Sequence, residues 1–303
     1  MFHVEQKRTM ESIKQCLICD GSKFENYLEC TDYFLSKENF TLVKCSGCGF
    51  IFINPRPFPE ELYKYYESPD YISHSGTNKG IVNAVYKKVR RYTHNKKVKL
   101  VSKFSSGKSI LDIGCASGEL LNNFKLKNWE TLGIEPNQNA RNFAKSTYNI
   151  NVLDENEILN IPTASKDVIT MWHVLEHVSG LNERMLELKR ILKKDGTIFV
   201  AVPNKMSYDA EYYGKYWAAY DVPRHLYHFT PDSMAKLLNH HKFSIVKILP
   251  MKFDSYYVSM LSEKYKSGKN NLLKALYIGW KSNIKARKDK GACSSLIYVV
   301  KNT

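Results

Sequence analysis

Four cysteines near the amino terminus form two C-x-x-C pairs, Cys16 with Cys19 and Cys45 with Cys48. Two intervening residues let both thiolates of a pair face one point, so two pairs can surround a tetrahedral Zn²⁺ ion. The β-rich stretch 40–44 lies between the pairs, and this layout is typical of a zinc ribbon. A redox C-x-x-C is the alternative, but two pairs in so short a segment favour zinc. Four cysteines leave no open coordination position, so we expect this zinc to be structural.

A second group of residues lies in the segment 111–118, which reads LDIGCASG. Gly114 and Gly118 allow a ligand to approach the backbone where a strand turns into a helix, whose N-terminus favours a carboxylate or phosphate. Glu135 ends the next predicted strand, about 20 residues on, where an acid can bind both hydroxyls of a ribose. A dinucleotide-binding loop would have a third glycine, and its absence disfavours a pyrophosphate. Loop and acid predict an adenosine-containing ligand; an ordinary strand–helix turn with a capping acid is the alternative.

Residues 109–204 resemble class I S-adenosylmethionine-dependent methyltransferases in the motifs LDIGCASG, GIEPN and MWHVLEHV, followed by a helix, DG and VPN. The resemblance implies S-adenosylmethionine as the cofactor. The residues that it places around this cofactor are Asp112, Gly114 and Gly118 at the methionine moiety, Glu135 at the ribose, Asp154 near the adenine, and Trp172 and His173 toward the sulfonium or the acceptor.

His173, Glu176 and His177 also match the H-x-x-E-H string of inverted zinc peptidases. Those enzymes carry both histidines on an established helix, whereas this string spans the end of a predicted buried strand, so we reject a peptidase. Two interpretations of Glu176 and His177 stay open. The pair caps or orients the loop, or it is functional, with His177 catalytic, as similar Glu-His pairs assist a metal in quinone O-methyltransferases.

The aromatic and polar segment 212–229 follows the fifth predicted strand, where an insertion in this fold commonly covers the acceptor. Pro223-Arg224-His225 resembles a stretch of zinc-ribbon sugar C-methyltransferases in which a Glu-His pair acts. His225 matches their histidine, but Arg224 replaces the glutamate, which makes C-methylation less expected. We predict His225 as the base, with a structural histidine as the alternative. The residues predicted to contact the acceptor are Arg224, through a phosphate or carboxylate, and Tyr220 and Tyr66; Tyr66 and Tyr71 could also close over the cofactor or belong to the core.

An alternation of strands and helices must position these residues. It predicts a doubly wound α/β fold with a mostly parallel, seven-stranded, Rossmann-like sheet. The predicted strands are 109–113, 131–135, 151–153, 167–172, 197–202, 243–249 and 295–300, and the predicted helices are 119–127, 139–145, 181–194 (ended by Gly196) and 233–240.

We expect three parts along the chain: a zinc ribbon over residues 1–56, a helical linker or lid over 57–106, and a cofactor-binding catalytic domain over 107–303. The acceptor-site insertion occupies about 204–230. Residues 73–80 interrupt the helical pattern of the linker.

The chain has 303 residues and a net charge of +15, from 45 Lys and Arg against 30 Asp and Glu. The basic residues are scattered, which favours solvated helix faces over a nucleic-acid surface, although RNA or a phosphate-bearing substrate stays possible. No apolar run approaches the roughly 20 residues of a membrane span, and residues 1–14 do not resemble a secretory signal. We therefore expect a cytoplasmic protein.

The leading functional hypothesis is methylation of a sugar-type or related small acceptor, at oxygen rather than carbon, in surface polysaccharide or secondary-metabolite synthesis. It depends on the likeness of the whole chain to zinc-ribbon methyltransferases. The alternatives are an RNA methyltransferase, in which the ribbon and the basic surface hold the phosphate backbone, and a non-catalytic cofactor-binding protein. The sequence leaves the oligomeric state open.

Overall fold

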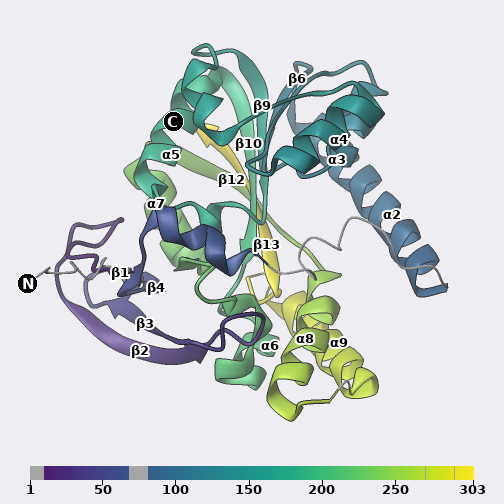
Figure 1. The fold of residues 1–303 in the computed structure, drawn as a ribbon. Coiled ribbons are helices and arrows are strands. Elements are labelled where there is room, and N and C mark those ends of the chain that lie inside the picture. Colours follow the sequence, from purple (N-terminus) through teal and green to yellow (C-terminus); the bar gives the residue numbers. More distant parts are fainter. Residues whose placement is uncertain (1–9, 68–80, 270, 290) are drawn as a thin grey trace, which may run out of the picture.

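The computed structural model describes residues 10–67, 81–269, 271–289 and 291–303, except for the side chains of 81–87. Its centre is a seven-stranded sheet in the order β12-β13-β10-β9-β6-β7-β8 (Figure 1). The pairs from β10 to β8 are parallel, and β13 is antiparallel to both of its neighbours. These strands are β6 (Ser109–Ile113), β7 (Glu130–Ile134), β8 (Asn151–Leu153), β9 (Lys166–Trp172), β10 (Leu192–Pro203), β12 (Phe243–Pro250) and β13 (Ser295–Asn302).

Helices cover both faces of this sheet, because alternate residues of its strands enter two separate cores. On β9, Ile169 and Met171 pack with α5 and α7, while Val168 packs with α2 and α3 on the other face. This confirms the predicted doubly wound, mostly parallel fold. The helices involved are α2 (Ile81–Phe104), α3 (Glu119–Lys125), α5 (Leu181–Ile191) and α7 (Pro231–His240), and α4 (Gln138–Tyr148) packs beside α3.

The predicted carboxyl end of the helix 181–194 is wrong. Helix α5 ends at Ile191 rather than Lys194, and β10 starts at Leu192 and continues through Gly196. Leu192 already pairs with Lys166 of β9, and a register shift follows before Thr197. Pairing with the neighbouring strand therefore overrides the helical pattern in the last turn.

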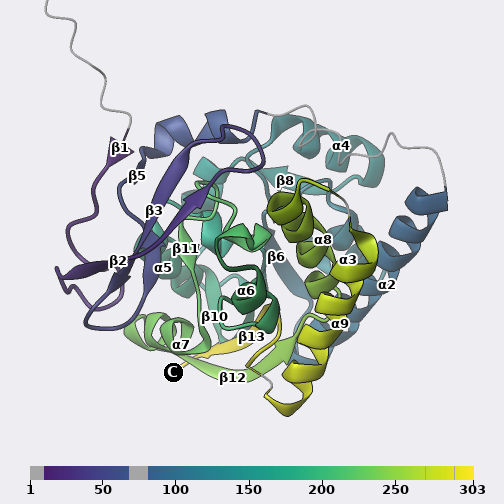
Figure 2. The same cartoon turned by 90° about the horizontal axis from the view of Figure 1, so that it is seen from below.

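The amino-terminal region forms a four-stranded antiparallel sheet in the order β11-β4-β3-β2. Its edge strand β11 belongs to the predicted acceptor insertion, more than 170 residues later in the chain. Figure 2 shows β2 and β3 on one side of the insertion helix α6, with α8 and α9 on the other. The elements are β2 (Phe24–Thr31), β3 (Asn39–Cys45), β4 (Ile51–Ile53), β11 (Tyr227–His228), α6 (Tyr208–Tyr213), and the pair β1 (Met10–Glu11) with β5 (Arg56–Pro57).

The amino-terminal sheet and the insertion also share a core. Phe40 and Leu42 of β3 cluster with Trp217 and Tyr220 of the insertion. The predicted domain boundaries near residues 56 and 106 stay a prediction. The amino-terminal sheet contains strands from both sides of the first boundary, since β11 pairs with β4. The short helices around it are η1 (Pro59–Tyr65), η3 (Glu155–Asn160), η4 (Leu175–His177), η5 (Gly214–Tyr216) and η6 (Ala218–Tyr220).

Two helices between β12 and β13 were not predicted. They are α8 (Asp254–Ser267) and α9 (Leu272–Lys288), which pack side by side below the sheet (Figures 1 and 2). None of the helices among the described residues combines the length and apolar composition that a bilayer crossing requires.

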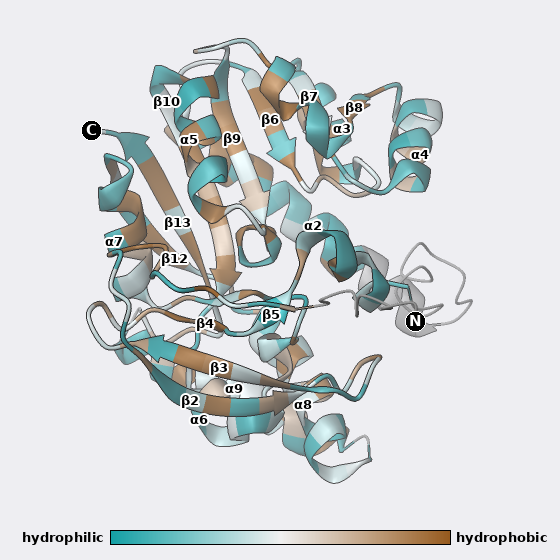
Figure 3. Ribbon diagram, turned by 60° about the vertical axis from the view of Figure 1, so that its left-hand side comes forward, coloured by the Kyte–Doolittle hydropathy of each residue, from teal (hydrophilic) through white to brown (hydrophobic). Residues whose placement is uncertain are grey.

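The predictions for Tyr71, for residues 73–80 and for residues 1–9 lie outside the described residues. Figure 3 shows the brown, hydrophobic centres of β9 and β10.

Candidate active site

The loop after β6 has the backbone conformation that its glycines allow. Gly114 and Gly118 have φ of 71° and 74°, in the left-handed region. A Cβ on Gly114 would lie 2.4 Å from Val174, and one on Gly118 would lie 2.9 Å from the Ala144 Cβ. Both positions therefore require glycine for packing as well as for the turn into α3.

Glu135 lies across this loop at the end of β7, as predicted. Its carboxylate accepts the Ala116 amide at 2.9 Å and the Asn137 amide at 3.0 Å. Burial raises the pKa of Glu135, an effect that these two hydrogen bonds oppose. The structure thus brings Glu135 together with the loop 114–118, here called the glycine loop.

Arg141 joins Glu135 to Asp154, which follows the next strand. Its Nη1 donates to the Glu135 carbonyl at 2.7 Å and lies 2.9 Å from Asp154 Oδ2. Asp154 also caps η3, where its carboxylate accepts the Asn156 amide. Arg141 therefore connects Asp154 to the backbone of Glu135, and Asp154 also caps η3; its placement near the adenine stays a prediction. The sequence reasoning missed Arg141.

Asp112 lies inside the sheet below the loop, and its carboxylate accepts the Thr170 hydroxyl at 2.5 Å. Burial raises its pKa to about 7. The positive charge of Lys97 on α2 opposes this rise in the pKa of Asp112, and burial lowers the pKa of Lys97 itself. The Lys97 ammonium lies 4.2 Å from the centre of the Trp172 ring. Trp172 Nε1 is buried and has no hydrogen-bond partner among the described residues.

Helix α2 supplies further contacts that the sequence reasoning missed. Arg90 forms an ion pair with Glu119 at 2.7 Å and donates to the Ser117 hydroxyl at 3.4 Å. Helix α2 therefore lies against both the glycine loop and the start of α3. The basic residues of α2, which the sequence analysis assigned to a solvated helix face, therefore include Arg90 beside the site.

A cluster of histidines and acids occupies the carboxyl end of β9. His173, with φ of 59°, directs Nε2 to Asp254 Oδ2 at 2.9 Å and Nδ1 to Glu176 Oε1 at 3.4 Å. Burial opposes the charge of His173, but the two carboxylates raise its pKa to about 10. His173 is therefore an imidazolium between two acids at neutral pH. Asp254, the first residue of α8, was not predicted.

His225 approaches the cluster from the insertion. Its Nδ1 lies 2.8 Å from the Ala219 carbonyl, which can only accept, so Nδ1 carries a proton. In the neutral ring Nε2 then has a free lone pair. The Asp221 carboxylate lies 3.9 Å from this Nε2.

His177 lies beside His225, with 4.6 Å between the ring centres. Its Nδ1 is 3.0 Å from the Arg224 carbonyl and 2.9 Å from the Tyr66 hydroxyl. Burial, with the nearby His225, lowers the pKa of His177 to about 4, so His177 is neutral at pH 7. Tyr66 thus reaches the histidine cluster, on the side predicted for the acceptor.

Glu176 is fully buried, and apart from the 3.4 Å ion pair with His173 neither of its carboxylate oxygens has a hydrogen-bond partner among the described residues. Burial would raise its pKa, but His173 and the other histidines hold that pKa below its usual range. Glu176, His177 and His225 place one possible ligand atom each within 4.8 Å of one another. This arrangement can remove and stabilise a proton, and its donor set also suits a divalent ion.

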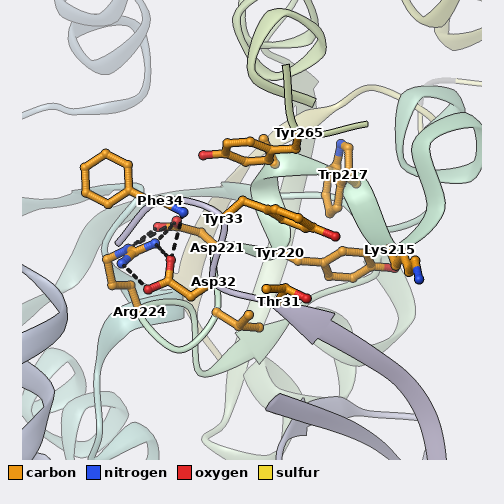
Figure 4. A pocket seen from close by; sticks show the side chains of 12 residues that line it. Thr31, Asp32, Tyr33, Phe34, Lys215, Trp217, Tyr220, Asp221, Arg224 and Tyr265 are labelled. Atoms are coloured by element: carbon orange, nitrogen blue, oxygen red, sulfur yellow. Dashed lines mark hydrogen bonds and ion pairs between the residues drawn. The ribbon is translucent and has the colours of Figure 1, made fainter. Parts of the chain in front are cut away.

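Arg224 is buried, and its guanidinium is occupied within the protein (Figure 4). It bonds Asp32 at 2.9 Å and Asp221 at 2.7 Å, and it donates to the Tyr65 carbonyl at 2.9 Å. The cavity beside it has a volume of about 10 Å³, which suits one water at most. Arg224 therefore has no free donor group that faces an open pocket, which argues against the predicted contact of Arg224 with the acceptor. Tyr220 is also buried, in the core shared with β3.

The four predicted zinc ligands come together at the start of the amino-terminal sheet. Cys16 Sγ lies 3.5 Å from Cys48 Sγ, and Cys19 Sγ lies 3.6 Å from Cys45 Sγ. All four sulfurs lie within 4.8 Å of one another. A Zn–S bond of about 2.3 Å in a tetrahedron requires sulfurs about 3.8 Å apart, so the residues fit this ion.

Solved structures with the same fold include S-adenosylmethionine-dependent methyltransferases. One from Archaeoglobus fulgidus has a TM-score of 0.50 and 19% identity, over 70% of this chain and 94% of that one. Geranyl diphosphate methyltransferase in complex with SAM gives 0.53 and 11%, over 77% and 95%. Geranyl diphosphate C-methyltransferase from Streptomyces coelicolor A3(2), in complex with Mg²⁺, geranyl diphosphate and S-adenosyl-L-homocysteine, gives 0.51 and 12%, over 78% and 84%.

Among curated protein sequences, no significant relative of the chain is found. The family model described as "Methyltransferase domain" matches residues 86–248, more than half of the 303 residues. This span includes the glycine loop, Glu135 and the histidine cluster around His173 and His225. The chain therefore belongs to the methyltransferase-domain family, and it is an S-adenosylmethionine-dependent methyltransferase.

Proposed function

We propose that this enzyme methylates an oxygen of a sugar-type or related small acceptor, with His225 as the base. The hydrogen bond from His225 Nδ1 to the Ala219 carbonyl carries this proposal, because it leaves Nε2 to take a proton. An acceptor hydroxyl must lose its proton as it is methylated, and a histidine can receive that proton near neutral pH. The Asp221 and Glu176 carboxylates would then stabilise the imidazolium.

The cofactor is proposed to lie between the glycine loop and α2. When bound, S-adenosylmethionine supplies a methyl group already activated by sulfonium. Glu135 would hold the ribose hydroxyls, and Gly114 and Gly118 would let the methionine moiety approach the backbone. The buried Trp172 Nε1 supports a ligand at this position, since this donor lacks a protein acceptor among the described residues. The Lys97 ammonium lies over the same ring.

Asp112 and Asp154 are proposed to act at the margins of the cofactor. Asp112 has its carboxylate inside the sheet, where it fixes Thr170 and faces the charge of Lys97. Asp154 would set the adenine end through Arg141. His173 is proposed to support the acceptor side rather than the cofactor, because both its ring nitrogens face acids.

His177 and Tyr66 are proposed to contact the acceptor beside His225. His177 stays neutral at pH 7, so it can accept or donate a hydrogen bond without adding charge. Arg224 would position the loop that holds His225 rather than bind the acceptor. Cys16, Cys19, Cys45 and Cys48 would hold a structural zinc that stabilises the amino-terminal sheet against this loop.

A product assay with S-adenosylmethionine carrying a labelled methyl group tests the proposal. Purified protein is incubated with a panel of nucleotide-linked sugars and related small hydroxyl acceptors, and the methylated atom is identified by NMR. Oxygen methylation that His225→Asn abolishes supports the proposal. Methylation of carbon would contradict the oxygen assignment, and transfer to RNA with a steep salt dependence would favour the nucleic-acid alternative.

A further inference from the structure

Helix α9 has an unusual distribution of residues between its two faces. The face toward the protein consists mainly of small side chains, namely Ala275, Ile278, Gly279, Ser282 and Ala286. The outward face carries large apolar side chains with these exposed fractions: Leu272 53%, Leu273 83%, Leu276 40%, Tyr277 53% and Trp280 51%.

These outward residues form one stripe, because they recur at helical spacing. Leu272, Leu276 and Trp280 are four residues apart, and Leu273 and Tyr277 repeat the same spacing beside them. The rings of Tyr277 and Trp280 lie 6.0 Å apart. Single exposed apolar residues are ordinary, but a continuous stripe with two aromatic rings is typical of a surface that binds something.

The charges around the stripe are almost entirely positive. Residues 254–289 contain three acids. Asp254 and Glu263 form ion pairs with His173 and Lys274, and Asp289 is exposed at the carboxyl end of α9. The basic residues of the same range are Lys264, Lys266, Lys269, Lys274, Lys281, Lys285, Arg287 and Lys288. Apolar and aromatic residues bordered by lysines are the composition of helices that lie in an anionic membrane interface.

We propose that the α8–α9 hairpin binds the surface of a bilayer that contains anionic lipid, through the stripe on α9. A second copy of the chain fits less well. A symmetric contact would bring the same eight basic residues of two copies together, with Asp289 as the one exposed acid in residues 254–289 to pair with them. Anionic headgroups supply the opposite charge, and the leucines and Trp280 enter the headgroup region.

The position of the hairpin connects this surface to the site. Helix α8 begins at Asp254, which bonds His173, and α9 packs beside α8 at the outside of the molecule (Figures 1 and 2). Docking would therefore bring the histidine cluster close to the membrane. Vesicle binding can be measured without any acceptor, so its outcome is independent of the proposed reaction.

Co-sedimentation of the full chain with vesicles tests the proposal. We expect binding to vesicles of phosphatidylcholine with phosphatidylglycerol and little binding to phosphatidylcholine alone. The variant Leu273→Ser/Trp280→Ser should bind about tenfold more weakly or less. The matched control Leu126→Ser/Leu186→Ser changes side chains that are 76% and 58% exposed elsewhere, and it should bind as the wild type.

Charge and self-association provide two further readouts. Arg287→Glu/Lys288→Glu should weaken vesicle binding, and added salt should weaken it in the wild type. S-adenosylhomocysteine affinity verifies that each variant is folded. Equal binding of all variants to the vesicles, or none by the wild type, would overturn the proposal. A concentration-dependent dimer in light scattering that Leu273→Ser/Trp280→Ser abolishes would also overturn it, in favour of a second copy.

Discussion

Arg224 and Asp32 form a buried ion pair, with Nη2 2.9 Å from Oδ1, although 192 residues separate them in the chain. Asp32 follows β2 of the amino-terminal sheet, and Arg224 precedes the proposed base His225. The same guanidinium bonds Asp221 of the insertion and the Tyr65 carbonyl of η1. One side chain therefore joins three segments around the acceptor side of the site.

Replacing Arg224 by methionine should destabilise the protein strongly. The change leaves Asp32 and Asp221 without their cation, and breaking a buried pair in this way costs about 3–5 kcal/mol. Urea unfolding measures the loss. The exposed pair of Lys64 and Glu61 provides the control, because Lys64→Met removes a solvated interaction. Equal stability of the two variants would show that the Arg224 network has little energetic weight.

Replacing His225 by asparagine should lower kcat by about 10²–10⁴, the usual contribution of a positioned base. The affinity for S-adenosylhomocysteine should stay unchanged, since His225 lies on the acceptor side. Steady-state kinetics and a cofactor titration on the same preparation separate the two effects. An unchanged kcat would assign His225 a structural role.

The imidazolium of His173 predicts a specific dependence of stability on pH. Its pKa is raised to about 10 in the folded protein, from an ordinary value near 6.5. The stabilisation is complete below about pH 6.5 and is lost as the pH rises toward 10. His173→Gln and Asp254→Asn should therefore differ most from the wild type near pH 6.5 and least near pH 9.5. Unfolding curves at both pH values measure this, and a constant difference would contradict the assignment.

Removal of zinc should impair the acceptor side of the site more than the cofactor side. The four-cysteine module packs on the insertion through the pairing of β4 with β11, whereas the glycine loop lies on the central sheet. Metal analysis should find one zinc per chain, and Cys16→Ser/Cys48→Ser should lose it. Methyl transfer should fall more than cofactor affinity does. A second equivalent of metal that His225→Asn removes would instead place an ion at Glu176, His177 and His225.

The central fold could be predicted because each strand carries its own local signal. Residues 198–202 are continuously apolar, and the structure confirms them as part of a central strand buried on both faces. The glycine loop and Glu135 were found for a related reason, since their spacing follows from consecutive parallel strands. These two parts of the proposed cofactor site could therefore be predicted from one continuous stretch of sequence.

The helical hairpin and the acceptor side were harder to predict. In α9 the buried face consists of alanine, glycine and serine with one isoleucine, Ile278, so the apolar periodicity marks the outward face. The pairing of β11 with β4 joins Tyr227 and Phe52 across the chain, and a strand of two residues carries no local pattern. Asp254 and Lys97 reach the site from elements that have no catalytic motif. Such contacts depend on tertiary packing.

The most direct measurement is a calorimetric titration with S-adenosylhomocysteine, comparing the wild type with Glu135→Ala. We expect micromolar binding that weakens by at least about tenfold in the variant, because hydrogen bonds to a charged group contribute about 1.5–3 kcal/mol each. Glu130→Ala, at the opposite end of β7 and mostly exposed, should bind as the wild type. Absence of binding by folded, zinc-loaded wild type, or full affinity in Glu135→Ala, would contradict the proposed cofactor site.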